Sequence, residues 1–182
     1  MELIINDDNL KNIDIDEFSI KVRAILVDEN NQILIANYGN IILLPGGKVD
    51  EKESIYFAIS RELREELGCE YSEEELKFLG TINYYQKDYP KINGILKNRL
   101  VKTYYFIGKY KDVKKDTQKL TEKEQKGNFK LELVSLDSLE NIILSNKNNN
   151  PRNIYFQKEL LSIMELYKCI NEDEIVKKIE LK

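Results

Sequence analysis

The sequence contains no histidine. Without an imidazole, the chain cannot form a Ser-His-Asp triad, a Cys-His pair or a zinc site built on histidine. Any acid-base chemistry must therefore come from carboxylates, lysine, tyrosine or cysteine.

Cysteine is also scarce, with only Cys69 and Cys169. Their spacing is not that of a metal site, and we expect two reduced thiols. No apolar run is long enough to cross a membrane, and the N-terminus lacks the basic start and small-residue cleavage site of a signal peptide. The sequence therefore predicts a cytoplasmic protein with no membrane partner.

An excess of positive charge is lacking too, because the formal net charge is −4. Broad nucleic-acid binding needs a basic face, so we do not expect it. A small molecule that carries phosphate stays compatible with this charge if a metal ion reverses the local sign. The 182 residues, of which 42% are hydrophobic and 33% charged, predict a single globular domain over residues 1–182.

Alternating and apolar segments bounded by turn residues predict a largely β-structured chain. We predict strands at residues 18–27, 32–37, 41–44, 76–85, 100–110 and 129–134. The highly charged residues 111–128 are predicted to be a loop, and helices are expected at 136–144 and about 154–170. Helices at both ends of a mixed β-sheet indicate an α/β (α+β) fold, an α-β-α sandwich with a C-terminal helix.

Residues 53–67 form the clearest helical pattern, with apolar residues at three- and four-residue spacing. Gly68 follows at the place of a left-handed C-terminal cap. Towards this end lie Glu62, Glu65 and Glu66, which share one face, although the end of a helix disfavours negative charge. Two interpretations stay open: a solvated acidic face, or carboxylates that hold a divalent cation.

The wider spacing favours the cation. Gly47 is followed after five residues by Glu53 and after seven more by Arg-Glu-Leu-Arg-Glu-Glu-Leu-Gly-Cys, residues 61–69. This pattern resembles the Nudix box, the signature of the Nudix hydrolase superfamily, over residues 47–69. Cys69 stands where an aliphatic residue is usual, and a buried cysteine behaves as a small hydrophobe.

The resemblance implies a Nudix-type fold and a set of roles. Glu62, Glu65 and Glu66 match positions that bind Mg²⁺ or Mn²⁺, and the carbonyl of Gly46 matches a backbone ligand. Glu53 matches a glutamate that forms a structural ion pair with the box arginine, here Arg61. We expect Arg61 and Arg64 to project away from the carboxylate face.

Other site residues are less fixed by the resemblance. Lys52 stands where many family members have glycine, which predicts a loop that turns differently. Many members add a late-loop glutamate, and we predict Glu124 as a fourth metal ligand or catalytic base beside Glu62, Glu65 and Glu66. A surface glutamate without a role is the alternative. Candidate substrate contacts are Arg23, Lys48, Tyr85 and Arg99.

The function implied by the resemblance is metal-dependent hydrolysis of a pyrophosphate bond in a nucleoside diphosphate linked to another group. ADP-ribose, a nucleoside triphosphate and a dinucleoside polyphosphate all stay open as the small-molecule nucleotide substrate. The alternative function is a non-catalytic Nudix-type nucleotide-binding or sensor module. The choice between a monomer and a homodimer also stays open.

Overall fold

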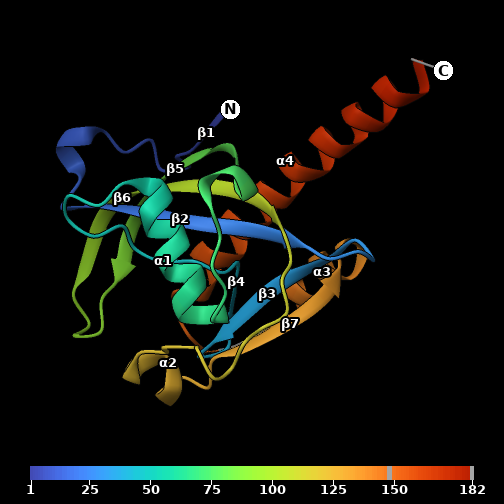
Figure 1. Ribbon diagram of the computed structural model, residues 1–182. Helices are drawn as coiled ribbons and strands as arrows, with labels where there is room; N and C mark the ends of the chain where they lie inside the picture. Colours follow the sequence, from blue (N-terminus) through green and yellow to red (C-terminus); the bar gives the residue numbers. More distant parts are fainter. Residues whose placement is uncertain (147–148, 181–182) are drawn as a thin grey trace.

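A mixed, seven-stranded sheet forms the centre of the computed structural model, which describes residues 1–146 and 149–180 (Figure 1). The strand order is β1-β5-β6-β2-β3-β4, and β7 pairs with β3. The long strands β2 and β6 run parallel in the middle, and β5 and β6 form an antiparallel hairpin. The strands are β1 (Glu2–Ile5), β2 (Glu17–Val27), β3 (Gln32–Tyr38), β4 (Ile41–Leu43), β5 (Lys77–Pro90), β6 (Leu96–Lys109) and β7 (Lys130–Ser135).

Helices cover both faces of this sheet. Figure 1 shows α1 in front of the sheet, while α4 passes behind it. The helices are α1 (Ile55–Leu67), α2 (Glu122–Lys126), α3 (Leu136–Ser145) and α4 (Asn153–Glu180). The predicted α+β fold with a mixed sheet between helices is confirmed. Across the described residues, no helix is long and apolar enough to cross a membrane.

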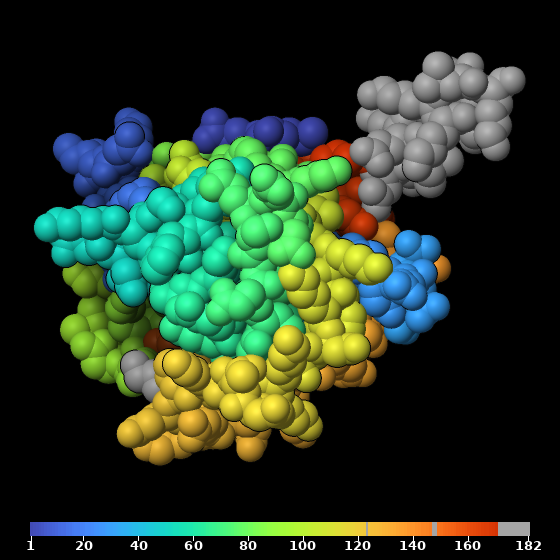
Figure 2. Space-filling model, viewed as in Figure 1, coloured from blue at the N-terminus to red at the C-terminus, as the bar shows by residue number. Residues whose placement is uncertain are grey.

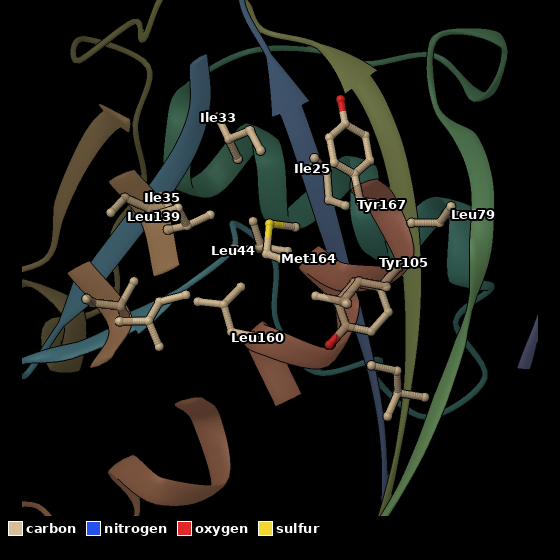
Figure 3. Close-up of a cluster of buried hydrophobic side chains, with 14 of the residues drawn as sticks. Ile25, Ile33, Ile35, Leu44, Leu79, Tyr105, Leu139, Leu160, Met164 and Tyr167 are labelled. Carbon is tan, nitrogen blue, oxygen red and sulfur yellow. The ribbon is translucent and has the colours of Figure 1, made fainter. Parts of the chain in front are cut away.

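The central strand β2 supplies side chains to two apolar layers, because neighbouring residues of a strand point to opposite faces. Val22, Ala24 and Leu26 pack on the α1 side. Ile25 packs on the other side, with residues of α3 and α4. Figure 3 shows this second layer, in which Leu160, Met164 and Tyr167 of α4 lie against the sheet. Both layers fix β2 in place.

Two predictions about the elements need correction, and one strand was not predicted. The strand that was not predicted is β1, a short edge strand whose register with β5 depends on residues about 80 positions away in the sequence (Glu2 pairs with Thr81). The predicted loop 111–128 contains the one-and-a-half-turn helix α2. The β5–β6 hairpin continues further than predicted, to Pro90 and Leu96, because a bulge between Gln86 and Tyr89 absorbs the irregular residues.

Candidate active site

Helix α1 places the clustered glutamates, and Gly68 caps its C-terminal end as the sequence predicts. The Ser54 side chain accepts a hydrogen bond from Phe57 N (3.1 Å), and Gly68 takes the left-handed conformation with φ 72°. The apolar face of the helix is buried on the sheet. This packing fixes the rotation of α1, and it turns Glu62 and Glu65 towards the loop that precedes the helix.

That loop lies directly against β2. Gly47 O accepts from Val22 N (3.0 Å), and Pro45 O accepts from Ala24 N (2.9 Å). Gly46 has φ 125°, and a Cβ atom there would lie 2.3 Å from Val22 O. A Cβ atom on Gly47 would lie 2.4 Å from an oxygen of Glu62. Only glycine at both positions lets the backbone approach strand and carboxylate this closely.

Loop, helix and sheet together enclose a pocket of about 350 Å³. We call it the carboxylate pocket. The structure brings together in its wall most of the side chains that the sequence selects. These charged residues are Arg23, Lys48, Arg61, Glu62, Glu65, Glu66 and Glu124.

Two predicted substrate contacts lie elsewhere. The Tyr85 hydroxyl is 3.2 Å from Asn12 Oδ1, outside the carboxylate pocket. Arg99 lines a second pocket at the far end of the β5–β6 hairpin. Arg23 on β2 and Arg99 on β6 therefore lie at separate sites, although the two strands are neighbours in the sheet.

Glu66 is the most buried carboxylate of the pocket, with 5% of its surface exposed. Its Oε2 accepts a hydrogen bond from Gly46 N (2.8 Å). Burial raises the pKa of Glu66 to about 8, and the nearby charge of Arg23 opposes this only in part. A buried carboxylate with so little compensation is stabilised by an added cation.

Arg61 connects the loop to the helix. Its Nε and Nη2 bond the two oxygens of Glu53, at 2.7 and 2.9 Å. Its Nη1 also bonds Glu62 Oε1 (2.8 Å) and Glu65 Oε2 (3.3 Å). The expectation that Arg61 projects away from the carboxylates is therefore wrong, because one guanidinium offers donors in several directions.

These contacts shift the carboxyl groups in opposite directions. The hydrogen bond from Arg61 holds the pKa of Glu53 below its usual range. Burial raises the pKa of Glu62, although Arg61 acts against the rise. Glu53 is therefore stabilised in its charged form by Arg61, whereas the surroundings of Glu62 and Glu66 disfavour their charged forms.

The donor set suits a hard divalent cation, because carboxylate and backbone oxygens are the ligands that Mg²⁺ and Mn²⁺ prefer. Among the side chains that the structure describes, no three acidic, cysteine or histidine side chains converge closely enough to hold one ion. Glu62 and Glu65 turn to Arg61 instead, and the Gly46 carbonyl accepts from the Arg23 guanidinium. The uncompensated Glu66 is the observation that fits a metal ion best.

The segment between β6 and α2 closes the C-terminal end of α1. Lys114 N bonds Leu67 O (2.8 Å), and Lys119 N bonds Glu65 O (2.9 Å). Figure 2 shows this segment, in yellow, lying along α1, in blue-green. Its backbone donors bond a helix end that carries partial negative charge, which offsets part of the penalty of the acidic cluster.

The same segment brings Glu124 to the pocket. Glu124 Oε2 accepts from the backbone N (2.6 Å) and Oγ1 (2.8 Å) of Thr121, which precedes α2. Its charge contributes to the raised pKa of Glu66. The residue therefore caps a short helix and also adds negative charge to the pocket.

Lys52 adopts φ 67°, the left-handed conformation that glycine favours. At this residue the loop keeps the handedness that a glycine would give it, in contrast to the expected change of turn. The Lys52 side chain is exposed and is not part of the pocket wall.

Sequence reasoning missed two aromatic residues of the pocket, Tyr38 and Phe129. They lie at the end of β3 and just before β7, which pair with each other. No local pattern marks them, since their approach to α1 depends on long-range strand pairing. A planar ring of the substrate would find its apolar contact here.

Comparison with known proteins completes the description of the site. A family model described as the NUDIX domain matches residues 18–157, which is most of the chain. No curated protein matches the chain in sequence.

Several solved structures share the fold. The MutT protein from Methanosarcina mazei Go1 is 22% identical with a TM-score of 0.50, and the match covers 78% of this chain and 91% of that one. A NUDIX hydrolase from Nitrosomonas europaea is 18% identical with a TM-score of 0.52, covering 80% and 90%. A bifunctional NMN adenylyltransferase/ADP ribose pyrophosphatase from Francisella tularensis is 19% identical with a TM-score of 0.51, covering 82% of this chain but 42% of that one.

Proposed function

Because this chain belongs to the Nudix hydrolase family and is a pyrophosphohydrolase of that family, we propose that it cleaves a pyrophosphate bond in a nucleoside diphosphate linked to another group. The observation that carries this proposal is the carboxylate pocket itself. Four glutamates line this pocket together with the glycine loop and the cationic side chains of Arg23, Lys48 and Arg61. Such a pocket offers oxygen ligands for a metal and positive charge for phosphate in one place.

Glu62, Glu65 and Glu66 are the residues that would hold Mg²⁺ or Mn²⁺, with Glu124 as a further candidate. When bound, the ion would neutralise phosphate charge and lower the pKa of a water molecule. Glu66 suits this role because it is buried and accepts a hydrogen bond from one backbone donor, Gly46 N. Arg61 holds the carboxylates of Glu62 and Glu65 in the same pocket as Glu66 through hydrogen bonds.

The other groups of the pocket bind and orient the substrate in this proposal. Arg23 and Lys48 bind phosphate oxygens, which are bidentate partners for a guanidinium and point-charge partners for an ammonium. Without histidine in the chain, a glutamate accepts the proton of the attacking water. Glu65, Glu66 and Glu124 are the candidates, since each lines the pocket.

The alternative is a nucleotide-binding module that does not hydrolyse its ligand. A pocket that only binds nucleotide has no need for buried carboxylates, because they repel phosphate. This chain keeps all of them together in one wall. The geometry therefore favours the hydrolase.

The substrate is proposed as a class. ADP-ribose, nucleoside triphosphates and dinucleoside polyphosphates each carry the bond that the pocket would cleave. The fold is shared with part of an enzyme named as an ADP ribose pyrophosphatase, which is compatible with the first of these. The volume of about 350 Å³ suits one small nucleotide.

A nucleotide panel tests the proposal. The full chain is incubated with ADP-ribose, nucleoside triphosphates and dinucleoside polyphosphates, with Mg²⁺, with Mn²⁺ or with EDTA, and products are separated by chromatography. We expect cleavage of at least one compound with either metal and none with EDTA. Saturable binding of a nucleotide without cleavage of any compound would instead establish the binding module.

A further inference from the structure

A second pocket, of about 450 Å³, lies at the end of the β5–β6 hairpin. We call it the Arg99 pocket. It shares no lining residue with the carboxylate pocket. Its wall consists of Tyr89, Lys91, Ile92, Asn93, Arg99 and Arg152.

Arg99 is held rigidly with its charge turned into this pocket. Only 7% of the residue is exposed, and its Nε donates to the buried Gln86 Oε1 (2.5 Å). The guanidinium carbon lies 3.5 Å from the centre of the Tyr89 ring, a stacking distance. In the part of the chain that the structure describes, no acceptor bonds the two terminal nitrogens of Arg99. Their donors are therefore oriented but unused.

Arg152 places a second guanidinium group near the ring of Tyr89. Its carbon lies 5.5 Å from the centre of Tyr89, and its Nε donates to Pro90 O (2.8 Å). Lys91 supplies a third positive charge.

Negative charge in the wall is insufficient to balance these cations. Lys91 is paired with Glu17, at 2.5 Å. Glu159 is the other acidic residue whose charge acts on Arg99. Its carboxylate accepts hydrogen bonds from the hydroxyl groups of Thr103 and Tyr105, and it forms no ion pair with a described arginine. Neither Arg99 nor Arg152 forms an ion pair with any acidic side chain that the structure describes. Burial together with the charge of Arg152 lowers the pKa of Arg99, while Tyr89 and Glu17 oppose the change.

The geometry points to a phosphate-binding site: we propose that the Arg99 pocket binds the phosphate group of a small phosphorylated molecule. Two planar guanidinium groups with free terminal donors match the oxygens of a phosphate group. Asn93 adds a polar side chain, and Tyr89 and Ile92 offer apolar contact to the organic part of the ligand. The volume lies within the range of small-molecule sites.

This site is distinct from the one where cleavage is proposed. Across the β2–β6 pair, Arg99 lies opposite Glu17, six residues before Arg23 on β2. Six residues of strand span roughly 20 Å. The bound phosphate therefore belongs either to a separate metabolite or to the far end of a long substrate.

Direct binding tests the proposal without relying on activity. Calorimetry with the full chain in EDTA, at constant ionic strength, measures binding of inorganic phosphate and of AMP up to about 10 mM, the weak end of specific binding. We expect saturable binding, weakened at least ~10-fold in Arg99→Gln and in Arg152→Gln, since each loses a charge-assisted partner. Arg99→Lys, which keeps the charge but loses the planar fork, should fall between wild type and Arg99→Gln.

Two controls make the assignment specific. Lys97→Gln removes a partly exposed charge from the same strand outside the pocket, and Lys109→Gln removes an exposed charge from the other end of that strand. Both should bind phosphate within ~2-fold of wild type, which is below half the energy of one tenfold step. Absence of binding to the wild type, unchanged affinity in both arginine variants, or loss of binding in Lys109→Gln would overturn the proposal. Arg152→Gln keeps the test valid if Arg99→Gln fails to fold.

The source of the phosphate is then found with the substrate that the nucleotide panel identifies, and this step rests on the proposed function. A raised KM with unchanged kcat in Arg152→Gln would assign the phosphate to the far end of the substrate. Unchanged kinetics together with lost AMP binding would assign it to a separate metabolite. If the panel finds no substrate, the binding measurements still decide whether the pocket holds phosphate.

Discussion

Two segments supply the glutamates of the carboxylate pocket, and the structure holds them by different means. Residues 46–68, the glycine loop with α1, are fixed by backbone bonds to β2, by the Glu53–Arg61 pair and by a buried apolar stripe. Residues 111–126, which end in α2, are mostly exposed. They are attached through backbone bonds to carbonyls at the end of α1, such as Leu67 O.

This difference implies that the position of the second segment depends on the first, and not the reverse. The loop and α1 carry their own restraints, whereas the later segment takes its position from α1. A change in the first segment should therefore affect the chemistry or the stability strongly, and a change in the second should affect only what Glu124 contributes. Variants in each segment can test this dependence, beginning with the largest effect.

The carboxylates of α1 should carry the largest effect. We expect Glu65→Gln and Glu66→Gln each to lower kcat by at least ~10²-fold, as loss of a metal-held nucleophile would. The Glu66 variant should melt at a higher temperature than wild type in EDTA at neutral pH, because it removes a buried carboxyl group whose raised pKa lowers the stability of the fold at pH values above its ordinary pKa of 4.5. Steady-state kinetics and thermal melts measure the two effects.

Glu70→Gln is the matched control for these variants. Glu70 follows the end of α1, and its side chain is exposed and outside the pocket, 3.8 Å from Arg64. Its kinetics should equal those of wild type. Normal kcat in both Glu65→Gln and Glu66→Gln would refute the roles assigned to α1.

Arg61→Ala tests how the first segment is held. The variant leaves Glu53 without its partner and frees Glu62 and Glu65. We expect the free energy of unfolding to fall by roughly 1–4 kcal/mol, because breaking a largely buried pair leaves an uncompensated charge. Urea unfolding monitored by circular dichroism gives this value.

Arg64→Ala provides the comparison, since Arg64 lies one turn further on and forms only an exposed pair with Glu70. Its loss should cost less than ~1 kcal/mol. Equal stability of the Arg61 and Arg64 variants would show that the loop does not depend on Arg61.

The parts of the carboxylate pocket differ in how far they could be predicted from the sequence. Glu62, Glu65 and Glu66 lie on a periodic helix, so their shared face follows from their spacing, and the cap at Gly68 follows from the glycine that ends the pattern. Tyr38 and Phe129 reach the pocket only because β3 pairs with β7, about 100 residues away in sequence, and nothing local encodes that pairing. Arg61 could not be placed fully even though it lies on the same helix. Helical spacing predicts the direction in which its side chain leaves the helix axis, but it does not predict which acceptors so long a side chain will reach.

Glu124 separates the two functions of the second segment. Glu124→Gln keeps an oxygen that can accept from Thr121 N but loses the charge. If Glu124 binds the metal or the proton, kcat should fall by about 10-fold or more, within the range of general acid-base contributions, with little change in stability. Thr121→Ala removes the hydroxyl partner and should change stability alone. Unaltered kcat in Glu124→Gln would leave Glu124 with the capping role only.

Lys52 gives the smallest expected effect and tests the backbone of the first segment. Its φ of 67° costs a residue with a Cβ atom roughly 1 kcal/mol, while glycine tolerates it. The greater chain entropy of glycine in the unfolded state cancels part of this gain, so Lys52→Gly should stabilise the fold by about 0.5 kcal/mol. Lys52→Ala is the matched control, because it removes the same exposed side chain and charge but keeps the strained conformation. Thermal melts should therefore rank glycine above both alanine and wild type, which should be nearly equal. If alanine raised the melting temperature as much as glycine, the gain would come from the lost side chain and the left-handed backbone would carry no strain.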